Sequence, residues 1–262
     1  MIRVAGHFGE WLQGRLGADG PVALVTMACP ALSVRLERIG DGSFSLEQST
    51  RILAPSHLAC LWRQSKRPEG RFRLRADMPP GGGAGASTAA LIALTRAAGM
   101  PKSGIAALCL SVEGATDPLM LEAPDAVLWA SREARALEAL PPPPRARIVG
   151  GFFGPPCPTD AADHDFPDIS DLMKDWRTAP NLVAAARLAS VSAQRCTALR
   201  GPADDPMPEL AATTGALGHV RAHTGSARGL VFAPGSDTRA AEHAMAEAGA
   251  TGLVTFETGG RP

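Results

Sequence analysis

Glycines and two hydroxyl side chains lie together in residues 78–90, which read Met-Pro-Pro-Gly-Gly-Gly-Ala-Gly-Ala-Ser-Thr-Ala-Ala. Glycine lets bare backbone approach a ligand, because it has no Cβ and adopts positive φ at little cost. Where a helix starts after such glycines, its unpaired N–H groups and its dipole favour an anion, most often a phosphate. Ser87 and Thr88 add hydroxyls that can cap the helix or contact a metal-bound phosphate. The motif alone leaves a plain flexible loop with a Ser or Thr cap equally open.

A strand and a helix are predicted to flank this stretch. Residues 71–76 alternate polar and apolar side chains, which is typical of a strand with one exposed face. Residues 87–98 are rich in Ala and Leu and stop at Gly99, as a helix does. The strand has three arginines on one face, so we expect it to be one-sided and antiparallel. A dinucleotide fold fits poorly, since its strand is buried on both faces. A P-loop would need a Lys where Ala86 stands.

Two acidic side chains follow in the next predicted helix and turn. An apolar stripe over residues 101–113 predicts a second helix that ends near Glu113, and Asp117 lies in the Gly/Pro turn beyond it. These carboxylates have two interpretations: solvated surface groups, or a metal ligand and a general base that face the glycine-rich loop. Spacing does not decide between them.

Residues 6–14, near the start of the chain, hold a third group of polar side chains among glycines. One interpretation is a hairpin turn that leads into a strand at residues 22–25. The other is a tight loop that presents Glu10 and Gln13 to a polar small molecule.

Composition narrows the class of protein. The chain has 262 residues, with 26 basic and 26 acidic side chains, so no net charge favours a nucleic-acid partner. Tyr is absent and aromatics are few, which argues against a base-stacking surface. Five cysteines without a close pair predict reduced thiols. We found no signal-peptide pattern and no membrane-spanning apolar run, so we expect a cytoplasmic protein without a membrane partner.

Four prolines at residues 141–144 predict a stiff connector between two domains, at residues 1–140 and 145–262. In the first, strands are expected at residues 21–27 and 31–39, with a hairpin at Asp41-Gly42 leading to a short partner strand at 44–46. The second is expected to open with a strand at 145–149 and continue helix–helix–strand–strand–helix–strand, an α+β layer with helices on one face. Residues 150–168 are long for a loop, which suggests a lid or mobile flap.

Four stretches, in order along the chain, resemble motifs of the GHMP kinases, the superfamily of galactokinase, homoserine kinase, mevalonate kinase and phosphomevalonate kinase. Within it the chain is most similar to the L-threonine kinases linked to cobalamin synthesis and propanediol utilisation. Residues 8–14 resemble that family's Cys-Gly-Glu-Leu-x-Gln-Gly opening, and residues 78–90 align with its phosphate loop without a gap. Residues 108–117 resemble the end of its next helix with one residue inserted. Residues 222–230 resemble its Ala-His-Ser-Gly-Thr-x-x-Gly-Leu motif.

The resemblance implies a two-lobed α+β fold with mixed or antiparallel sheets, helices packed on one side and the active site between the lobes. It implies ATP-dependent phosphorylation of a hydroxyl of L-threonine or a related amino alcohol, with ATP and Mg²⁺ as cofactors and a homodimer as a possible state. Ser87 and Glu113 would complete the Mg²⁺ shell, and Asp117 would orient and deprotonate the acceptor hydroxyl. The implied phosphate-binding residues are Pro79, Gly81, Gly82, Gly83, Ala84, Gly85, Ala86, Ser87 and Thr88. The implied acceptor-binding residues are Glu10, Gln13, His223, Thr224, Gly225 and Ser226.

The chain departs from the family pattern at several positions. Gly82 stands where the family has Lys, Ala86 replaces the first of two serines, and Ala90 replaces an Asp. His7 and Phe8 replace small residues before the Gly-Glu pair. Losing the loop cation would weaken charge neutralisation. A second hypothesis is therefore a relative that binds nucleotide or an amino acid without turnover. A third and weaker one is a dinucleotide-dependent oxidoreductase.

Overall fold

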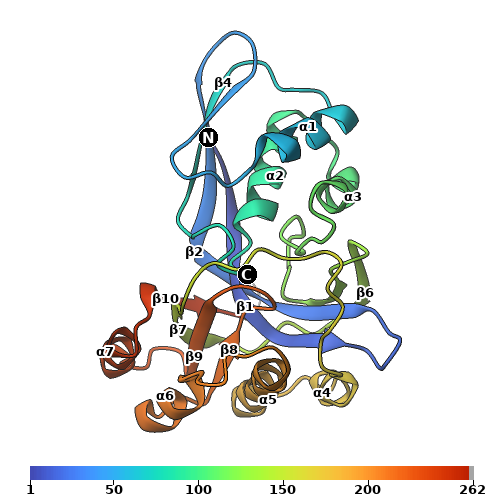
Figure 1. The fold of residues 1–262 in the computed structure, drawn as a ribbon. Helices are drawn as coiled ribbons and strands as arrows, with labels where there is room; N and C mark the ends of the chain where they lie inside the picture. Colours follow the sequence, from blue (N-terminus) through green and yellow to red (C-terminus); the bar gives the residue numbers. More distant parts are fainter. Residues whose placement is uncertain (260–262) are drawn as a thin grey trace.

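Two long antiparallel strands, β1 (Ile2–Arg15) and β2 (Val22–Gly40), run through both lobes of the chain (Figure 1). The structure is a computed structural model that describes residues 1–259. The two strands stay paired from Ile2 opposite Leu36 to Arg15 opposite Val22, with three register shifts along β1. Since β1 also pairs with β8 of the C-terminal half, through Glu10 and Arg221, one sheet joins the two lobes.

The described strands form one mixed sheet of ten strands in the order β10-β7-β9-β8-β1-β2-β4-β3, with β5 pairing with β2 and β6 with β5. All of the pairs are antiparallel except β3 with β4. The other strands are β3 (Ser45–Gln48), β4 (Arg71–Ala76), β5 (Val127–Ala130), β6 (Arg135–Ala139), β7 (Ala146–Phe152), β8 (Gly218–Arg221), β9 (Ala227–Phe232) and β10 (Thr251–Thr258).

Three helices complete the N-terminal lobe. The helix after the glycine-rich loop, α2 (Ala86–Ala97), packs against β1 and β2, while α1 (Pro55–Gln64) packs against α3 (Lys102–Glu113). Because α2 is apolar almost all round, nine of its residues are buried. The loop at its start is therefore carried by a helix anchored in the core.

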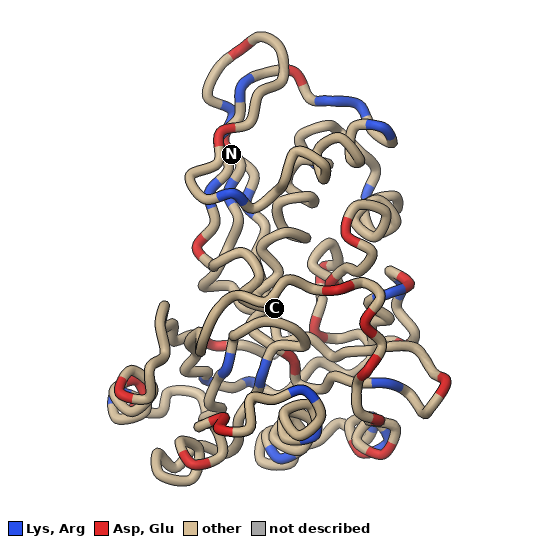
Figure 2. Tube along the Cα trace, in the orientation of Figure 1, with Lys and Arg blue, Asp and Glu red and all other residues tan. Residues whose placement is uncertain are grey.

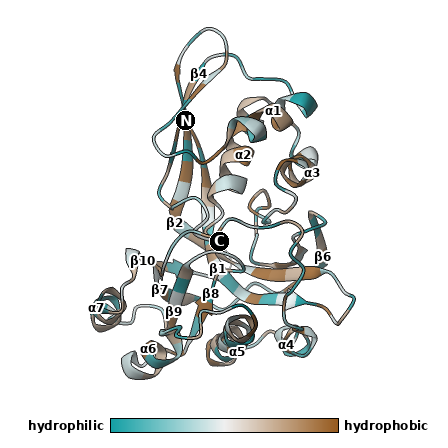
Figure 3. Cartoon of the chain, in the orientation of Figure 1, coloured by the Kyte–Doolittle hydropathy of each residue, from teal (hydrophilic) through white to brown (hydrophobic). Residues whose placement is uncertain are grey.

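Four helices cover the sheet of the C-terminal lobe on its outer side (Figure 1). They are α4 (Ser170–Trp176), α5 (Leu182–Arg200), α6 (Met207–Thr214) and α7 (Arg239–Glu247). The longest, α5, packs against β1 and β8, and its start is capped by Asn181, whose Oδ1 accepts a hydrogen bond from the Ala184 N–H at 3.0 Å. Figure 3 shows hydrophobic and hydrophilic residues together on these helices, as expected for helices with one packed face.

One large hydrophobic core extends across the join between the lobes, with a smaller cluster under α6 and α7. Phe8 of β1 is fully buried and packs edge-on against Phe152 and Phe256, with ring centroids 5.4 and 5.8 Å apart. Trp11, also on β1, packs against Trp176 of α4 at 5.7 Å. Aromatic contacts therefore join the first strand to the second half of the chain.

Several elements confirm local sequence patterns. The strand predicted at residues 71–76 is β4, whose buried Phe72 and Leu74 alternate with exposed or half-buried arginines. The predicted helices at 87–98 and 101–113 correspond to α2 and α3 within one residue at either end. The second half follows the predicted element order, apart from the additional helix α4. The α+β, two-lobed fold class is confirmed.

Three expectations were wrong. Residues 21–27 and 31–39 are one continuous strand, because β1 pairs with both ends of β2. The strand after Asp41-Gly42 does not form a hairpin with β2 but pairs in parallel with β4. Residues 6–14 are neither a turn nor a loop, since they lie within β1. The domain boundary at residues 141–144 stays a prediction.

Basic and acidic residues are interspersed along the chain in both lobes (Figure 2). Within residues 1–259, no helix combines the length and apolar character that crossing a membrane requires.

Candidate active site

A cavity of about 380 Å³ lies where the glycine-rich loop, β1, the turn after α3 and the loop after β8 meet. It brings together most of the residues singled out in the sequence: Glu10, Pro79, Gly81, Gly83, Ala84, Gly85, Ala86, Ser87, Thr88, Glu113, Asp117, His223 and Thr224. It does not include Gln13, Gly82, Gly225 or Ser226.

Positive φ angles shape the loop at three alternate glycines. Gly81, Gly83 and Gly85 have φ of 73°, 79° and 74°, and Gly85 is the N-cap of α2. A Cβ on Gly83 would lie 2.3 Å from the carbonyl oxygen of Thr224, and one on Gly85 would lie 2.7 Å from the His7 ring. Glycine is required there because the backbone conformation and the close approach both exclude a side chain. The loop thus offers the free N–H groups of a helix start to the cavity.

The loop is held from three sides. The Ala227 N–H donates to the Gly82 carbonyl at 2.8 Å, and the His7 N–H donates to the Ala84 carbonyl at 3.3 Å. The Cys157 N–H donates to the Gly81 carbonyl at 2.9 Å. Gly82 therefore faces away from the cavity and packs against Gly225. A Cβ on Gly225 would lie 2.5 Å from the Gly82 carbonyl carbon.

Two carboxylates face the hydroxyls at the start of α2. Ser87 donates a hydrogen bond to Glu113. Thr88 Oγ1 lies 3.1 Å from Oε2 of Glu113 and 3.4 Å from Oδ2 of Asp117. Burial raises the pKa of Glu113 to about 7, since hydrogen bonds from Ser87 and Thr88 only partly offset it. A buried carboxylate and a hydroxyl side by side are hard oxygen donors, so they fit a Mg²⁺ ion.

A bulged segment of β1 turns His7 and Glu10 toward the same cavity. In a regular strand, side chains three positions apart point to opposite faces. The register of β1 shifts between His7 and Glu10, and Gly9 between them has a φ of 68°. A bulge of this kind re-aims a side chain. A Cβ on Gly9 would lie 2.8 Å from the Arg221 carbonyl, so the bulge also fits tightly against β8.

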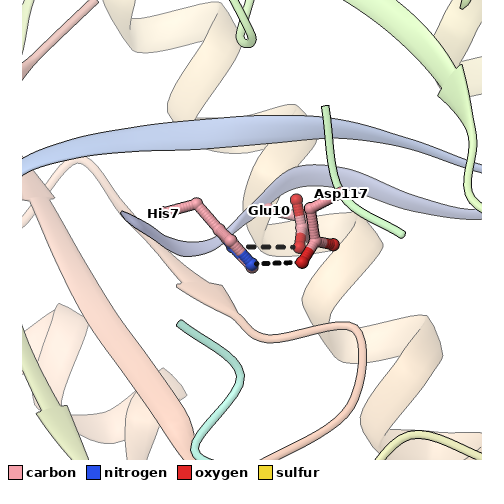
Figure 4. A group of neighbouring side chains, drawn as sticks. All are labelled: His7, Glu10 and Asp117. Carbon is pink, nitrogen blue, oxygen red and sulfur yellow. Dashed lines mark ion pairs between the residues drawn. The ribbon is translucent and has the colours of Figure 1, made fainter. Parts of the chain in front are cut away.

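The imidazole of His7 lies between two carboxylates (Figure 4). Its Nε2 is 3.2 Å from Oδ2 of Asp117, and its Nδ1 is 3.4 Å from Oε1 of Glu10. Burial opposes the charged imidazolium, but Asp117 and Glu10 outweigh it and raise the pKa of His7 to about 9. Burial likewise opposes ionisation of Asp117, yet the His7 charge and hydrogen bond hold the pKa of Asp117 below its usual value. Asp117 is therefore an ionised carboxylate near neutral pH.

Glu10 is a buried acid whose hydrogen bonding is incomplete. Its side chain is 1% exposed, and apart from the ion-pair contact with His7 neither carboxyl oxygen has a hydrogen-bond partner among the described residues. Burial raises the pKa of Glu10 to about 8, although His7 pulls it down. Ligand atoms of His7, Glu10 and Asp117 lie within 4.8 Å of one another. A protonated His7 already fills the space between the two acids, so we assign no metal there.

Gln13 does not reach the cavity. Its amide Nε2 donates to the Arg221 carbonyl at 2.9 Å, and its Oε1 accepts from the Cys196 thiol at 3.7 Å. Gln13 therefore ties β1 to β8 and α5. Ser226 is buried beside the loop, where its carbonyl accepts from the Phe153 N–H.

The segment at residues 154–168 closes the cavity from the C-terminal side. Phe166 stacks on His223 with ring centroids 4.0 Å apart. The Arg200 guanidinium lies 4.3 Å from the centroid of the Phe166 ring. Thr159 and Thr224 share a hydrogen bond of 2.7 Å. Burial lowers the pKa of His223 to about 3, so its neutral ring presents two nitrogens that lack a partner in the described chain.

Sequence reasoning missed Ser131, Arg132 and Thr159, which also line the cavity. The first two lie in the turn between β5 and β6, two short strands that the sequence patterns did not predict. No local pattern in the sequence indicates a functional role for these two residues, because only the folded sheet brings this turn beside Asp117.

No protein-family model matches the chain, and no curated protein matches it by sequence. Solved structures of three small-molecule kinases resemble it over nearly the whole length. The L. major mevalonate kinase in complex with R-mevalonate is 12% identical with a TM-score of 0.60, and the alignment covers 100% of this chain and 96% of that one. The homoserine kinase from Cytophaga hutchinsonii is 13% identical with a TM-score of 0.57, covering 98% and 94%.

A 4-(cytidine 5'-diphospho)-2C-methyl-D-erythritol kinase is 18% identical with a TM-score of 0.59, covering 99% of this chain and 100% of that one. Sequence identities this low show a shared fold and do not show a shared activity. The chain has the fold of the GHMP kinases.

Proposed function

We propose that this protein is an ATP-dependent kinase that phosphorylates a hydroxyl of L-threonine or a related amino alcohol. The observation that carries the proposal is the position of Thr88. Its hydroxyl touches both Glu113 and Asp117 at the first turn of the helix that follows the glycine-rich loop. An anion site, a candidate magnesium ligand and a candidate base thus share one cavity.

The phosphates of ATP would lie against the loop. Backbone N–H groups from Gly83 to Thr88 would bind their oxygens, and the closely packed glycines leave room for them. Ser87 and Glu113 would hold Mg²⁺, which supplies charge neutralisation for phosphoryl transfer. The fit is supported by the raised pKa of Glu113, since a nearby cation would relieve the cost of burying its charge.

Asp117 is the proposed general base. Phosphoryl transfer depends mostly on positioning, and a base within hydrogen-bond reach aligns the acceptor hydroxyl and takes its proton. His7 keeps Asp117 ionised and fixes its orientation through the 3.2 Å contact. In this account, His7 is a positioning residue.

Glu10 supports an acceptor that carries an amino group. Apart from the ion pair with His7, this buried carboxyl lacks hydrogen-bond partners in the described chain, which is costly until a further donor binds it. An ammonium or hydroxyl of the acceptor would supply that donor, and His223 and Thr224 would contact the acceptor from the other wall. Gly225 and Ser226 would act only by shaping that wall, and Gln13 by holding β1.

A second candidate is a relative that binds nucleotide or an amino acid without turnover. The absence of a Lys or Arg from residues 78–90 favours it, since the loop brings no cation to the phosphates. A dinucleotide enzyme is less well supported, because β4 is antiparallel to β2 and has one exposed face. The cytoplasmic location and a homodimer stay predictions.

The proposal is tested by ADP release with ATP, Mg²⁺ and a panel of L-threonine, L-serine, L-homoserine, 1-amino-2-propanol and ethanolamine. We expect acceptor-dependent ADP release with at least one of them. ATP binding by calorimetry without any turnover would favour the second candidate, and a thermal shift with NAD but none with ATP would favour the third.

A further inference from the structure

Arg132 is the one lysine or arginine among the described residues that line the cavity. The glycine-rich loop contributes backbone N–H groups and hydroxyls but no charged side chain. The positive charge of His7 is balanced by the carboxylate of Asp117 at 3.2 Å. A guanidinium is therefore the remaining fixed cation that faces the ligand space.

The sheet places Arg132 beside the base. The turn that carries it follows β5, which pairs with β2. The Ser131 N–H donates to the Val22 carbonyl at 3.2 Å, and the Ser131 carbonyl accepts from the Thr116 N–H at 2.9 Å. The residues that precede Arg132 and Asp117 are therefore joined by this last hydrogen bond. It brings the two charged side chains close enough to interact. This arrangement holds the cation near the point where the acceptor oxygen would meet the phosphoryl group.

The guanidinium has donors to spare. Its Nη2 donates to the carbonyls of Asp160 and Asp163 at 3.1 and 3.4 Å. Its Nε is buried without a partner in the described chain, and no hydrogen bond from Nη1 is formed there. Because the guanidinium carries five N–H donors in one plane, its Nη1 remains able to donate to an oxygen of a phosphoryl group.

We propose that Arg132 is a catalytic residue that neutralises the transferring phosphoryl group, in place of a cation in the loop. This inference rests on the proposed kinase function. A bond forms between the acceptor oxygen and the γ-phosphorus while the bond to the β,γ-bridging oxygen breaks, and ADP leaves with that electron pair. The acceptor proton passes to Asp117. Arg132 keeps its protons and donates hydrogen bonds to the oxygens that gain charge, which lowers the barrier.

Two other roles make different predictions. If Arg132 only anchored the segment at residues 154–168, its removal would raise both KM values and expose that segment to protease. If it bound an acceptor carboxylate, its removal would affect L-threonine but not 1-amino-2-propanol.

The test compares Arg132→Ala and Arg132→Lys with the control Arg135→Ala, an exposed arginine of the same hairpin that pairs with Glu133. Calorimetry would measure ADP binding with Mg²⁺ and the best acceptor of the panel, with and without aluminium fluoride, which mimics the phosphoryl group in transfer. In the wild type and in the control, fluoride should tighten ADP binding. In both Arg132 variants the tightening should fall at least about tenfold, with ADP affinity itself within about twofold.

Turnover gives a second readout. Arg132→Ala should lower kcat by about 10²–10³-fold with every acceptor. Added guanidinium ion should restore part of it, while Arg135→Ala should be neither impaired nor rescued. The inference is overturned if Arg132→Ala keeps the fluoride tightening, if only carboxylate-bearing acceptors are affected, or if guanidinium gives no rescue. A wild type that neither turns over nor responds to fluoride would instead overturn the proposed kinase function, and the inference with it.

Discussion

The Nε2 of His7 lies 3.2 Å from Oδ2 of Asp117, although the two residues are 110 positions apart in the chain. The contact joins a bulge in β1 to the turn after α3. It decides the charge of the proposed base, because burial alone would raise the pKa of Asp117 and the imidazolium reverses that effect. The site therefore depends on a long-range pair as much as on the glycine-rich loop.

Replacing His7 should impair the base without preventing nucleotide binding. In His7→Gln the cation beside Asp117 is lost, so the pKa of Asp117 rises and the base becomes protonated at a higher pH. We expect the acid limb of the kcat/KM profile to move up by about 1–2 pH units, and kcat at neutral pH to fall about 10- to 100-fold. His243→Gln, which removes an exposed histidine 3.3 Å from Glu247, is the control and should change neither. An unmoved acid limb in His7→Gln would remove His7 from the mechanism.

Glu10 should make stability depend on pH. Its pKa is about 8 when folded, against an ordinary value of 4.5, so the folded state keeps a proton that the unfolded chain releases. Stability from this proton is fully present below pH 4.5 and is lost as pH rises toward 8. In Glu10→Gln the decrease in the free energy of unfolding between pH 5 and pH 8 should be smaller by about 1–3 kcal/mol, as measured by urea unfolding. The exposed Glu37→Gln should retain the wild-type slope, and an equal slope in Glu10→Gln would contradict the assignment.

Gly83 offers a matched test of the loop. Gly83 and Gly17 have φ of 79° and 81°, so Ala at either position should cost about 1–2 kcal/mol of backbone strain. A Cβ on Gly83 also meets Ala222 and Thr224 at 2.3 Å, while Gly17 has open space within 4 Å. Gly83→Ala should therefore lose about 1–3 kcal/mol more stability and bind ATP more weakly. Thermal unfolding and calorimetry test this; equal behaviour of the two variants would place phosphate binding elsewhere.

Glu113 should control the response to magnesium. Its pKa is about 7, and the ion needs the carboxylate, so apparent Mg²⁺ affinity should increase as pH rises through 7. Glu113→Gln should raise the Mg²⁺ concentration for half-maximal activity about 10- to 100-fold and remove most of that pH dependence. Glu122→Gln, which removes an exposed acid paired with Lys102, should do neither. An unchanged Mg²⁺ response in Glu113→Gln would show that the ion binds without this residue.

Local patterns predicted the loop and its flanking elements well. The alternation in β4 and the Ala/Leu content of α2 are properties of neighbouring residues, and both elements fall within a residue of the predicted range. The same holds for α3, which ends at Glu113 as predicted. Because α2 carries Ser87 and Thr88 and α3 carries Glu113, this part of the site was visible in the sequence.

Contacts between distant segments could not be read in the same way. The glycines at residues 6–14 indicate a turn locally, but pairing with both β2 and β8 turns them into bulges of a strand. Gln13 has the character of a ligand-binding side chain, yet its partners come from β8 and α5. Arg132 lies between two strands that are too short to show a pattern. These features were not predicted for one reason: they depend on which distant segments pack against each strand in the folded sheet.

The central claim is tested most directly by ³¹P NMR of the wild type and Asp117→Asn with ATP, Mg²⁺ and the acceptor panel. The wild type should give ADP and a new phosphomonoester signal from the acceptor. Asp117→Asn should bind ATP with similar affinity but form that product about 10²–10⁴-fold more slowly. A wild-type sample that yields no phosphorylated acceptor, or an Asp117→Asn variant as fast as the wild type, would contradict the account.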